Sequence, residues 1–467
     1  MKPRHIILLI ADSLRWDSVY QNGGSKLPYI ANHSTSFLQA RSAGCWTLPA
    51  TASMFTGLLP HEHRATSQTR FLREDVPTLA ERLKDEGYKT HMITANIATT
   101  KIFGLERGFD VVKYAWAMIN PKHHGLHGLN ELLVLIGKPR LRKMLLSPKS
   151  LTGQLTSDLR ASRVWLQMTV DTILDTCRKI IKRMDRQKKN SFFFLNLMET
   201  HFPYHISNMF EFAARGFVEK AREAYSMYHL LNQSYLKRNK FYLDAEMLEN
   251  LRERQRYAWE LISSRVDEFV QEMKENHQAL VVFGSDHGDN FGEDGWQYHF
   301  SNVTDAGNRV PLFWLDPEED GDQAVDTPVS CRDLYGSILL SAGLNDPSFF
   351  HIAKAPERSQ TVMESYWYNN QGKTLPKYRF NQFAFVADST KYVFRKGRWL
   401  SAPVTTKNEK EESLVPLPKS VHPLQEKLVP PENEASLRKR FAEFTRFSSY
   451  VMNLKQNVRK KSQLLFS

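Results

Sequence analysis

The chain has 467 residues, with a hydrophobic content of 41%, a charged content of 24% and a net charge of +12. This length and composition exclude a disordered chain and allow one large α/β domain with a smaller one beside it. The positive charge favours anionic partners such as sulfate esters, phosphate esters, anionic polymers or a membrane surface. General solubility explains it equally well, and no motif for nucleic-acid binding is found.

The cysteines and the apolar runs of the sequence indicate where in the cell we expect the protein. Cys45, Cys177 and Cys331 are odd in number and lack the spacing of metal ligands, so we expect no disulfide framework and a reducing environment. The apolar run that starts at Ile6 is too short for a signal peptide. With no apolar run of 18 residues, we expect no transmembrane helix and a cytoplasmic location, and the oligomeric state stays open.

Strand and helix patterns alternate along the first hundred residues. Residues 6–11 form an apolar run typical of a strand buried on both faces of a parallel sheet. Helical patterns follow over residues 28–40, from about Pro49 to Gly57 and over residues 76–86, before a second strand at residues 89–95. This order predicts an α/β fold with a doubly wound, mostly parallel central sheet and helices on both faces.

The later part of the chain continues this pattern with longer insertions. We expect helices at 126–146 and 164–186, a strand at 191–197, mainly helix over 207–275, strands at 279–284 and 310–315, and a helix at 330–342. The basic segment 126–146 either packs on the domain with solvated cations or makes peripheral membrane contact.

The pattern predicts two structural units. The first spans residues 1–350 and carries helical insertions at about 111–190 and 205–275. The second spans residues 351–467, as a small antiparallel subdomain with a polar linker at 402–433 and a closing helix at 434–454.

Polar side chains stand at the ends of three predicted strands. Asp12 ends the first strand, His201 follows the strand at 191–197, and Asp286 and His287 follow the strand at 279–284. Open α/β sheets bind ligands beyond the carboxyl ends of their strands. Two aspartates and a histidine suit a divalent cation, namely zinc, manganese, magnesium or calcium, with a second ion as an open alternative.

Thr47 precedes Pro49 by two residues, where a loop enters a helix. One interpretation is an ordinary helix N-cap, a position that favours threonine. The other is a nucleophile near the positive end of the helix dipole, where a metal ion would lower the pKa of its hydroxyl. The polar residues at the ends of the three predicted strands favour the interpretation of Thr47 as a nucleophile.

These motifs resemble the sulfatase branch of the alkaline phosphatase superfamily, from Ile6 to about Leu344. The segments that carry the resemblance are Ile10–Asp17, Thr47–Gly57, Leu59–His63, His201–Tyr204, Gly284–Glu293, Tyr298–His299 and Arg309–Leu312. The resemblance implies a metal-dependent hydrolase of sulfate or phosphate esters. Asp12, Asp286 and His287 are the implied metal ligands. Thr47 is implied as the nucleophile and a further ligand.

The resemblance also implies roles for two histidines. His299 contacts the substrate oxyanion or protonates the leaving group, and His201 is a pocket histidine or a ligand of a second ion. The expected substrate is an anionic small molecule, or an ester on a glycan or a lipid head group.

The chain departs from the family pattern around its nucleophile. Sulfatases convert a cysteine or serine to formylglycine, and an arginine follows the proline by two residues, whereas here Thr47 and Thr51 occupy those positions. Cys45 does not fit the conversion signal, so no formylglycine is expected. Ser13 replaces a second aspartate, and the family's usual lysine in the loop after the second strand is missing, with Asn96 near that place.

A threonine nucleophile is instead what phosphodiesterase, phosphonate-hydrolase and phosphoethanolamine-transferase relatives use. We therefore expect a hydrolase that works through a covalent Thr47 intermediate and acts on a phosphomonoester, phosphodiester or phosphonate. The alternatives are a phospho-group transferase and a catalytically degenerate binding module. Further residues stay open between catalytic and structural roles: His61, His63, the group His123, His124 and His127, Arg15, Asp17, Asp289 and Asn290.

Overall fold

A central sheet of eight strands organises the computed structural model. It describes residues 2–20, 27–119, 169–202, 204, 245–299, 302–319, 321–353, 360–366, 380–387, 390–396, 398–404 and 415–416. In spatial order the strands are β11 (Gln323–Val325), β2 (Thr35–Phe37), β10 (Leu312–Leu315), β7 (Ala279–Gly284), β1 (His5–Ala11), β6 (Ser191–Leu197), β4 (Lys89–Thr94) and β5 (Val111–Tyr114).

The sheet is mostly parallel. β7, β1, β6, β4 and β5 run in one direction, and β10 runs antiparallel to both of its neighbours, β7 and β2. The described helices are α1 (Trp16–Tyr20), α2 (Pro28–Asn32), α3 (Thr47–Thr56), α4 (Pro60–His63), α5 (Leu79–Asp85), α6 (Ala115–Ile119), α10 (Thr169–Arg186), α13 (Ala245–His277), α14 (Asp305–Asn308) and α15 (Leu334–Ser341).

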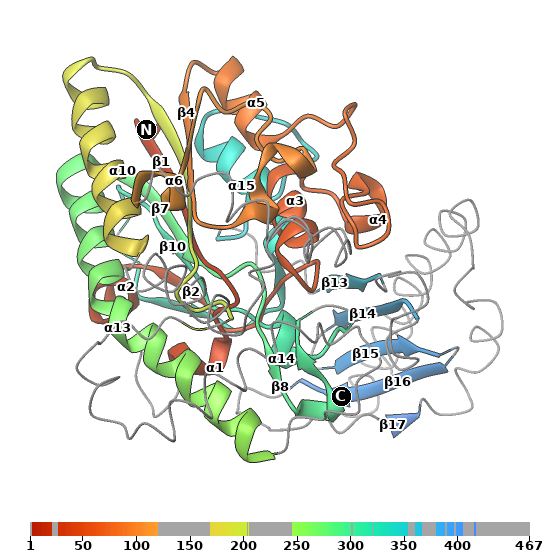
Figure 1. Cartoon of the computed structure of the whole chain (residues 1–467). Helices are drawn as coiled ribbons and strands as arrows, with labels where there is room; N and C mark the ends of the chain where they lie inside the picture. Colours follow the sequence, from red (N-terminus) through yellow and green to blue (C-terminus); the bar gives the residue numbers. More distant parts are fainter. Residues whose placement is uncertain are drawn as a thin grey trace, which may run out of the picture.

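Helices cover both faces of the sheet and form two hydrophobic cores (Figure 1). Because successive residues of a strand point to opposite faces, Ile6 and Leu8 of β1 pack into the core with α3, α5 and α15. Ile7 and Leu9 pack into the other core, with α2, α10 and α13. The prediction of a doubly wound α/β fold is confirmed.

A smaller antiparallel sheet follows in the chain and packs beside the first unit (Figure 1). Its strands, in order, are β13 (Gln360–Ser365), β14 (Gln382–Ala387), β15 (Thr390–Arg395), β16 (Arg398–Pro403) and β17 (Val415–Pro416). The backbone N–H of Glu364 donates to Ala43 at 2.9 Å, and Lys391 pairs with Asp305 at 2.9 Å. The first contact joins the sheet to the loop that precedes α3, and the second joins it to α14.

Two short ladders complete the described strands. β3 (Ala40–Arg41) pairs in parallel with β12 (Val329–Ser330), and β8 (Asn290–Phe291) pairs antiparallel with β9 (Gln297–Tyr298). The second ladder brings the segment after β7 back toward the carboxyl edge of the large sheet. No helix of the described part of the chain has the length and apolarity needed to cross a membrane.

One predicted helix is wrong over most of its length. The helix expected over residues 28–40 ends at Asn32, and the strands Thr35–Phe37 and Ala40–Arg41 follow. β2 is enclosed by β10 and β11, so partners distant in the sequence satisfy its backbone groups and outweigh the local pattern.

The insertion expected at 111–190 begins with strand β5 rather than with a helix. The predictions for 126–146, 434–454 and most of 402–433 lie outside the described residues. Within 402–433, β16 runs to Pro403 and Val415–Pro416 form β17.

Candidate active site

Three neighbouring strands deliver the predicted site residues to one edge of the sheet. β1 lies between β6 and β7, and Ile10 is in register with Gly284, so Asp12 and Asp286 follow their strands at the same level. His201 follows β6 on the other side of β1. The convergence predicted from the strand ends is therefore confirmed.

Asp12 is fully buried, and side-chain amides surround it. Its Oδ2 accepts hydrogen bonds from Asn96 at 2.6 Å and from Asn196 at 3.1 Å. Burial alone would raise the pKa of Asp12. The charges of His201 and His287, together with the two amides, hold that pKa below its ordinary value. Asp12 is therefore kept as a carboxylate that can bind a cation.

The two carboxylate oxygens of Asp286 differ in their hydrogen bonds. Its Oδ1 accepts from the backbone N–H groups of Ser13, at 3.2 Å, and of His287, at 3.0 Å. Its Oδ2 is buried and has no hydrogen-bond partner among the described residues. Burial and the nearby charge of Asp12 raise the pKa of Asp286 to about 6. A buried carboxylate oxygen without a donor is costly unless a cation is bound to it.

His287 turns one ring nitrogen toward these carboxylates. Its Nδ1 donates to the carbonyl of Gly288 at 3.0 Å, which directs Nε2 into the site. Nε2 lies 3.3 Å from Thr47 Oγ1, 3.5 Å from Asp286 Oδ2 and 3.7 Å from Asp12 Oδ1. Burial lowers the pKa of His287, but the two carboxylates raise it above its ordinary value.

These groups fit a divalent cation. Asp12, Asp286 and His287 each offer a ligand atom, and the three atoms lie within 4.8 Å of one another. Oxygen and imidazole ligands suit zinc, manganese or magnesium, and the unpartnered Asp286 Oδ2 is the kind of atom that a metal ion satisfies. The donor chemistry of the site therefore agrees with the predicted ligand set.

Thr47 is the first residue of α3, and its side chain faces the same carboxylates. The N-cap is Trp46, so the interpretation of Thr47 as an ordinary N-cap is wrong. Thr47 Oγ1 accepts from Asn96 at 3.1 Å, and it lies 3.3 Å both from Asp12 Oδ2 and from His287 Nε2. The hydroxyl thus stands among the metal-ligand candidates and near the positive end of a helix.

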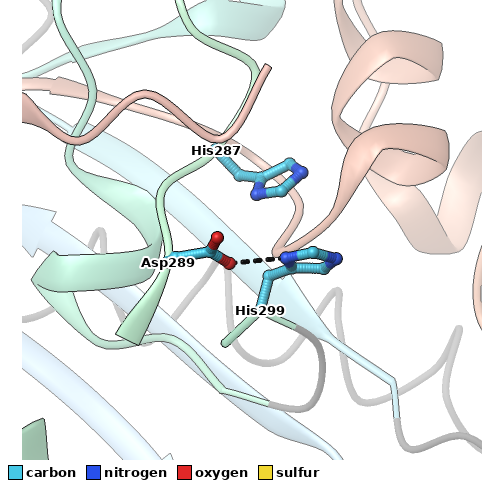
Figure 2. Close-up of side chains that lie close together, drawn as sticks. All are labelled: His287, Asp289 and His299. Carbon is cyan, nitrogen blue, oxygen red and sulfur yellow. Dashed lines mark hydrogen bonds and ion pairs between the residues drawn. The ribbon is translucent and has the colours of Figure 1, made fainter. Parts of the chain in front are cut away.

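His299 and His201 lie beside this group. The Nδ1 of His299 is 2.6 Å from Asp289 Oδ1, and Figure 2 shows the ring with this nitrogen toward the carboxylate. The rings of His201 and His299 are 5.1 Å apart, and His201 Nδ1 bonds the carbonyl of Phe202 at 2.7 Å. Burial lowers the pKa of His299 to about 4, although the Asp289 carboxylate opposes this shift.

Sequence reasoning assigned no role to two asparagines of the site. Asn96 comes two residues after the end of β4 and contacts both Asp12 and Thr47. Asn196 follows four apolar residues within strand β6 and contacts Asp12. The position of each asparagine could have identified it as a site candidate, as it did for Asp12. A polar residue at or near the carboxyl end of a strand lies at the edge of the sheet where ligands bind.

Several residues left open by the sequence have structural partners. Arg15 donates to Asp17 at 2.6 Å and to Glu293 at 2.7 Å, and its Nη1 also bonds the backbone oxygen of Asp289 at 2.9 Å. Arg15 therefore forms a local ion pair and also holds the backbone of the segment that follows His287. Asn290 donates from its side chain to the Tyr298 carbonyl at 2.7 Å.

The two histidines after α3 are held by contacts away from the ligand group. His63 is fully buried, its Nε2 is 3.0 Å from Ser53 Oγ, and its Nδ1 accepts from the N–H of Ala65. His61 pairs with Glu364 of the smaller sheet at 2.7 Å. His123, His124 and His127 lie outside the described residues.

The mostly parallel sheet, with carboxylates, imidazoles and a threonine hydroxyl at its carboxyl edge, defines an alkaline-phosphatase-like protein. The family model described as Sulfatase matches residues 4–344, and the chain belongs to this family.

Individual relatives are distant. Arylsulfatase K of Xenopus laevis is 23% identical over 373 residues, which cover 73% of this chain and 64% of the relative's length. The chain thus spans less than two thirds of the curated relative that it matches. A phosphonate monoester hydrolase from Silicibacter pomeroyi superposes with a TM-score of 0.57 at 17% identity, covering 87% of this chain and 90% of its own.

A second solved neighbour is in complex with its substrate, D-glucosamine-2-N,6-O-disulfate. It superposes with a TM-score of 0.53 at 15% identity, and the match covers 98% of each chain. Likenesses at this identity establish the alkaline-phosphatase-like fold, and the substrate of this chain does not follow from them.

Proposed function

We propose that this chain is a metal-dependent hydrolase of an anionic ester that works through a covalent intermediate on Thr47. One observation carries the proposal. Thr47 Oγ1 lies 3.3 Å from Asp12 Oδ2 and 3.3 Å from His287 Nε2, beside a buried oxygen of Asp286 that has no donor. A threonine in a merely structural position has no need of this polar environment.

The site residues divide the work of binding and attack. Asp12, Asp286 and His287, with Thr47 Oγ1, would hold a divalent ion, which when bound lowers the pKa of the hydroxyl and offsets charge on the ester. Asn96 donates to Thr47 Oγ1 at 3.1 Å and restricts its orientation. The start of α3 places positive backbone dipoles around the attacking oxygen.

The reaction proceeds in two displacements at phosphorus or sulfur. Thr47 Oγ1 attacks in line, the ester bond to the alcohol breaks, and His299 supplies the proton that the departing oxygen requires. Water then attacks the phosphorus or sulfur, the bond to Thr47 Oγ1 breaks, and the group held on Thr47 leaves as the free phosphate, phosphonate or sulfate product. His201, whose ring is 5.1 Å from that of His299, contacts the same anion as a pocket residue.

The substrate we favour is a phosphodiester, a phosphonate monoester or a phosphomonoester, with a sulfate ester as the remaining class. Threonine at the nucleophile position supports this order, because it cannot become the formylglycine that sulfatases use. The phosphonate monoester hydrolase among the structural neighbours supports it further. The neighbour that binds a sulfated glucosamine keeps a glycan within the proposed range of leaving groups.

The test is a panel of aryl phosphomonoester, phosphodiester, phosphonate and sulfate substrates, assayed with zinc, manganese, magnesium or calcium. Thr47→Ala should lower turnover roughly 1,000-fold or more, and Thr47→Ser should retain a measurable fraction of it. Mass spectrometry of acid-quenched protein should find the phospho- or sulfo-group on the peptide that contains Thr47. Wild-type turnover retained in Thr47→Ala, in a folded and metal-loaded protein, contradicts the proposal.

A cytoplasmic location stays a prediction from composition. Cell fractionation tests it, and recovery of the protein mainly outside the cytoplasm would contradict it.

A further inference from the structure

Three buried side chains form a line of hydrogen bonds beside the metal-ligand candidates. Tyr204 donates its hydroxyl to Asp289 Oδ2 at 2.8 Å, and Asp289 Oδ1 lies 2.6 Å from His299 Nδ1. Tyr204 is 2% exposed, and Asp289 is fully buried. The sequence had left Asp289 open between a turn and an ion ligand, and it assigned no role to Tyr204.

Both oxygens of Asp289 therefore accept a hydrogen bond. A carboxylate only accepts, so the proton of the short contact is on Nδ1 of His299. The backbone of Asp289 is held as well, because Arg15 Nη1 donates to its carbonyl at 2.9 Å. The N–H of the preceding Gly288 donates to Gly307 at 2.8 Å. The carboxylate thus has a fixed position from which to orient the imidazole.

The consequence for His299 is a defined tautomer. With Nδ1 protonated and turned to Asp289, Nε2 lies on the opposite side of the ring, as Figure 2 shows. The ring is 4.6 Å from that of His287 and 5.1 Å from that of His201. His299 is therefore oriented among the imidazoles of the candidate site and is not rotating at its surface.

We propose that Asp289 and Tyr204 are positioning residues that hold His299 in the Nδ1–H form and direct Nε2 at the reacting ester. This rests on the proposed function. In the first displacement, Nε2 takes the proton that the Thr47 hydroxyl loses on attack and passes it to the alcohol oxygen as the bond between that oxygen and phosphorus or sulfur breaks. In the second, Nε2 takes a proton from the attacking water and returns it to Thr47 Oγ1 as the bond to Thr47 breaks, which restores the Nδ1–H form.

A competing use of these residues is a second metal site. His287, Asp289 and His299 each offer a ligand atom, and these atoms lie within 4.8 Å of one another. The hydrogen bonds argue against it, because the Nδ1 of His299 and both oxygens of Asp289 already have partners. The two interpretations differ in the metal content of an Asp289 variant.

The experiment compares esters that differ only in the leaving alcohol, 4-nitrophenol or phenol, in the ester class that the wild type hydrolyses. The weakly basic nitrophenolate leaves without being protonated, whereas the more basic phenolate depends more strongly on receiving a proton as it leaves. Asp289→Ala should lower kcat/KM about 10-fold for the nitrophenyl ester and about 1,000-fold for the phenyl ester. Tyr204→Phe, which keeps the ring, should act in the same direction, by about 2-fold and about 10-fold.

A matched control removes a similar hydrogen bond elsewhere. The Tyr366 hydroxyl donates to the buried Glu364 at 2.9 Å in the smaller sheet. Tyr366→Phe should change both rates by less than about 2-fold. Because Tyr204→Phe keeps the aromatic packing, it still tests the proposal if Asp289→Ala does not fold.

Two readouts do not depend on turnover. Nitrogen-15 NMR should show His299 as the Nδ1–H form in the wild type and as a tautomer mixture in Asp289→Ala, and the metal content should be equal in the two proteins. Loss of a metal equivalent, equal losses on both esters, or an unchanged tautomer would each overturn the proposal. A wild type that hydrolyses no ester refutes the proposed function instead, and leaves the NMR result to decide the positioning of His299.

Discussion

Replacing Asn96 by alanine tests whether the amide that contacts both Asp12 and Thr47 organises the nucleophile. Asn96 donates to Asp12 Oδ2 at 2.6 Å and to Thr47 Oγ1 at 3.1 Å. Hydrogen bonds to charged groups contribute about 1.5–3 kcal/mol, and neutral ones contribute about 0.5–1.5 kcal/mol. Because about 1.4 kcal/mol corresponds to tenfold in rate, we expect kcat/KM to fall about 100-fold.

Asn196 provides the matched comparison. It donates to the same Asp12 oxygen at 3.1 Å, from β6. Asn196→Ala should therefore lower kcat/KM about tenfold, and the further tenfold of Asn96→Ala measures the contact with Thr47. Both variants are assayed at saturating metal, with circular dichroism as a check of folding. Equal losses in the two variants would refute the reasoning, because the Thr47 contact would then contribute nothing.

Three further predictions concern stability. Removing bound metal with a chelator should lower the thermal midpoint and abolish turnover, and adding metal should restore both; an unchanged midpoint contradicts the metal site. Burial lowers the pKa of His61, but Glu364 raises it above its ordinary value. The stability from this pair is therefore complete below about pH 6.5 and is lost as pH rises through the folded-state pKa, a dependence that Glu364→Gln should abolish in thermal melts. Gly288→Ala should destabilise by about 3 kcal/mol in denaturant titrations, because its Cβ would clash with the backbone oxygen of Ala306. Gly87→Ala, where φ is +83° but a Cβ meets nothing within 4 Å, should cost only about 1–2 kcal/mol.

The site at the carboxyl edge of the sheet could be predicted because local sequence patterns identify its residues. Asp12 follows one apolar run directly, Asp286 and His287 follow another after Ser285, and parallel strands end at one edge of a sheet. Thr47 could be placed because a proline two residues later indicates the start of a helix. In each of these cases a short local pattern determines the position of the side chain.

Other parts of the site and fold depend on pairings that local patterns do not contain. The strand Thr35–Phe37 forms because β10 and β11 enclose it, from positions nearly 300 residues later in the chain. Tyr204 meets Asp289 across 85 positions, through a hydrogen bond that no spacing rule encodes. The burial that brings these residues together is a property of the folded chain.

The sequence by itself determined the layered α/β architecture, the family resemblance and the identity of the metal-ligand candidates. The architecture and the ligand candidates follow from hydrophobic periodicity and from residues near strand ends, and the resemblance follows from short motifs, all of which extend over a few positions of the chain. Only the tertiary structure decided that Thr47 faces Asp12 and His287 rather than capping its helix, and that Asp289 bonds His299. The physical reason is that a side chain's partners depend on which distant segments share its buried environment, where an unpaired polar atom is costly and a hydrogen bond is strong.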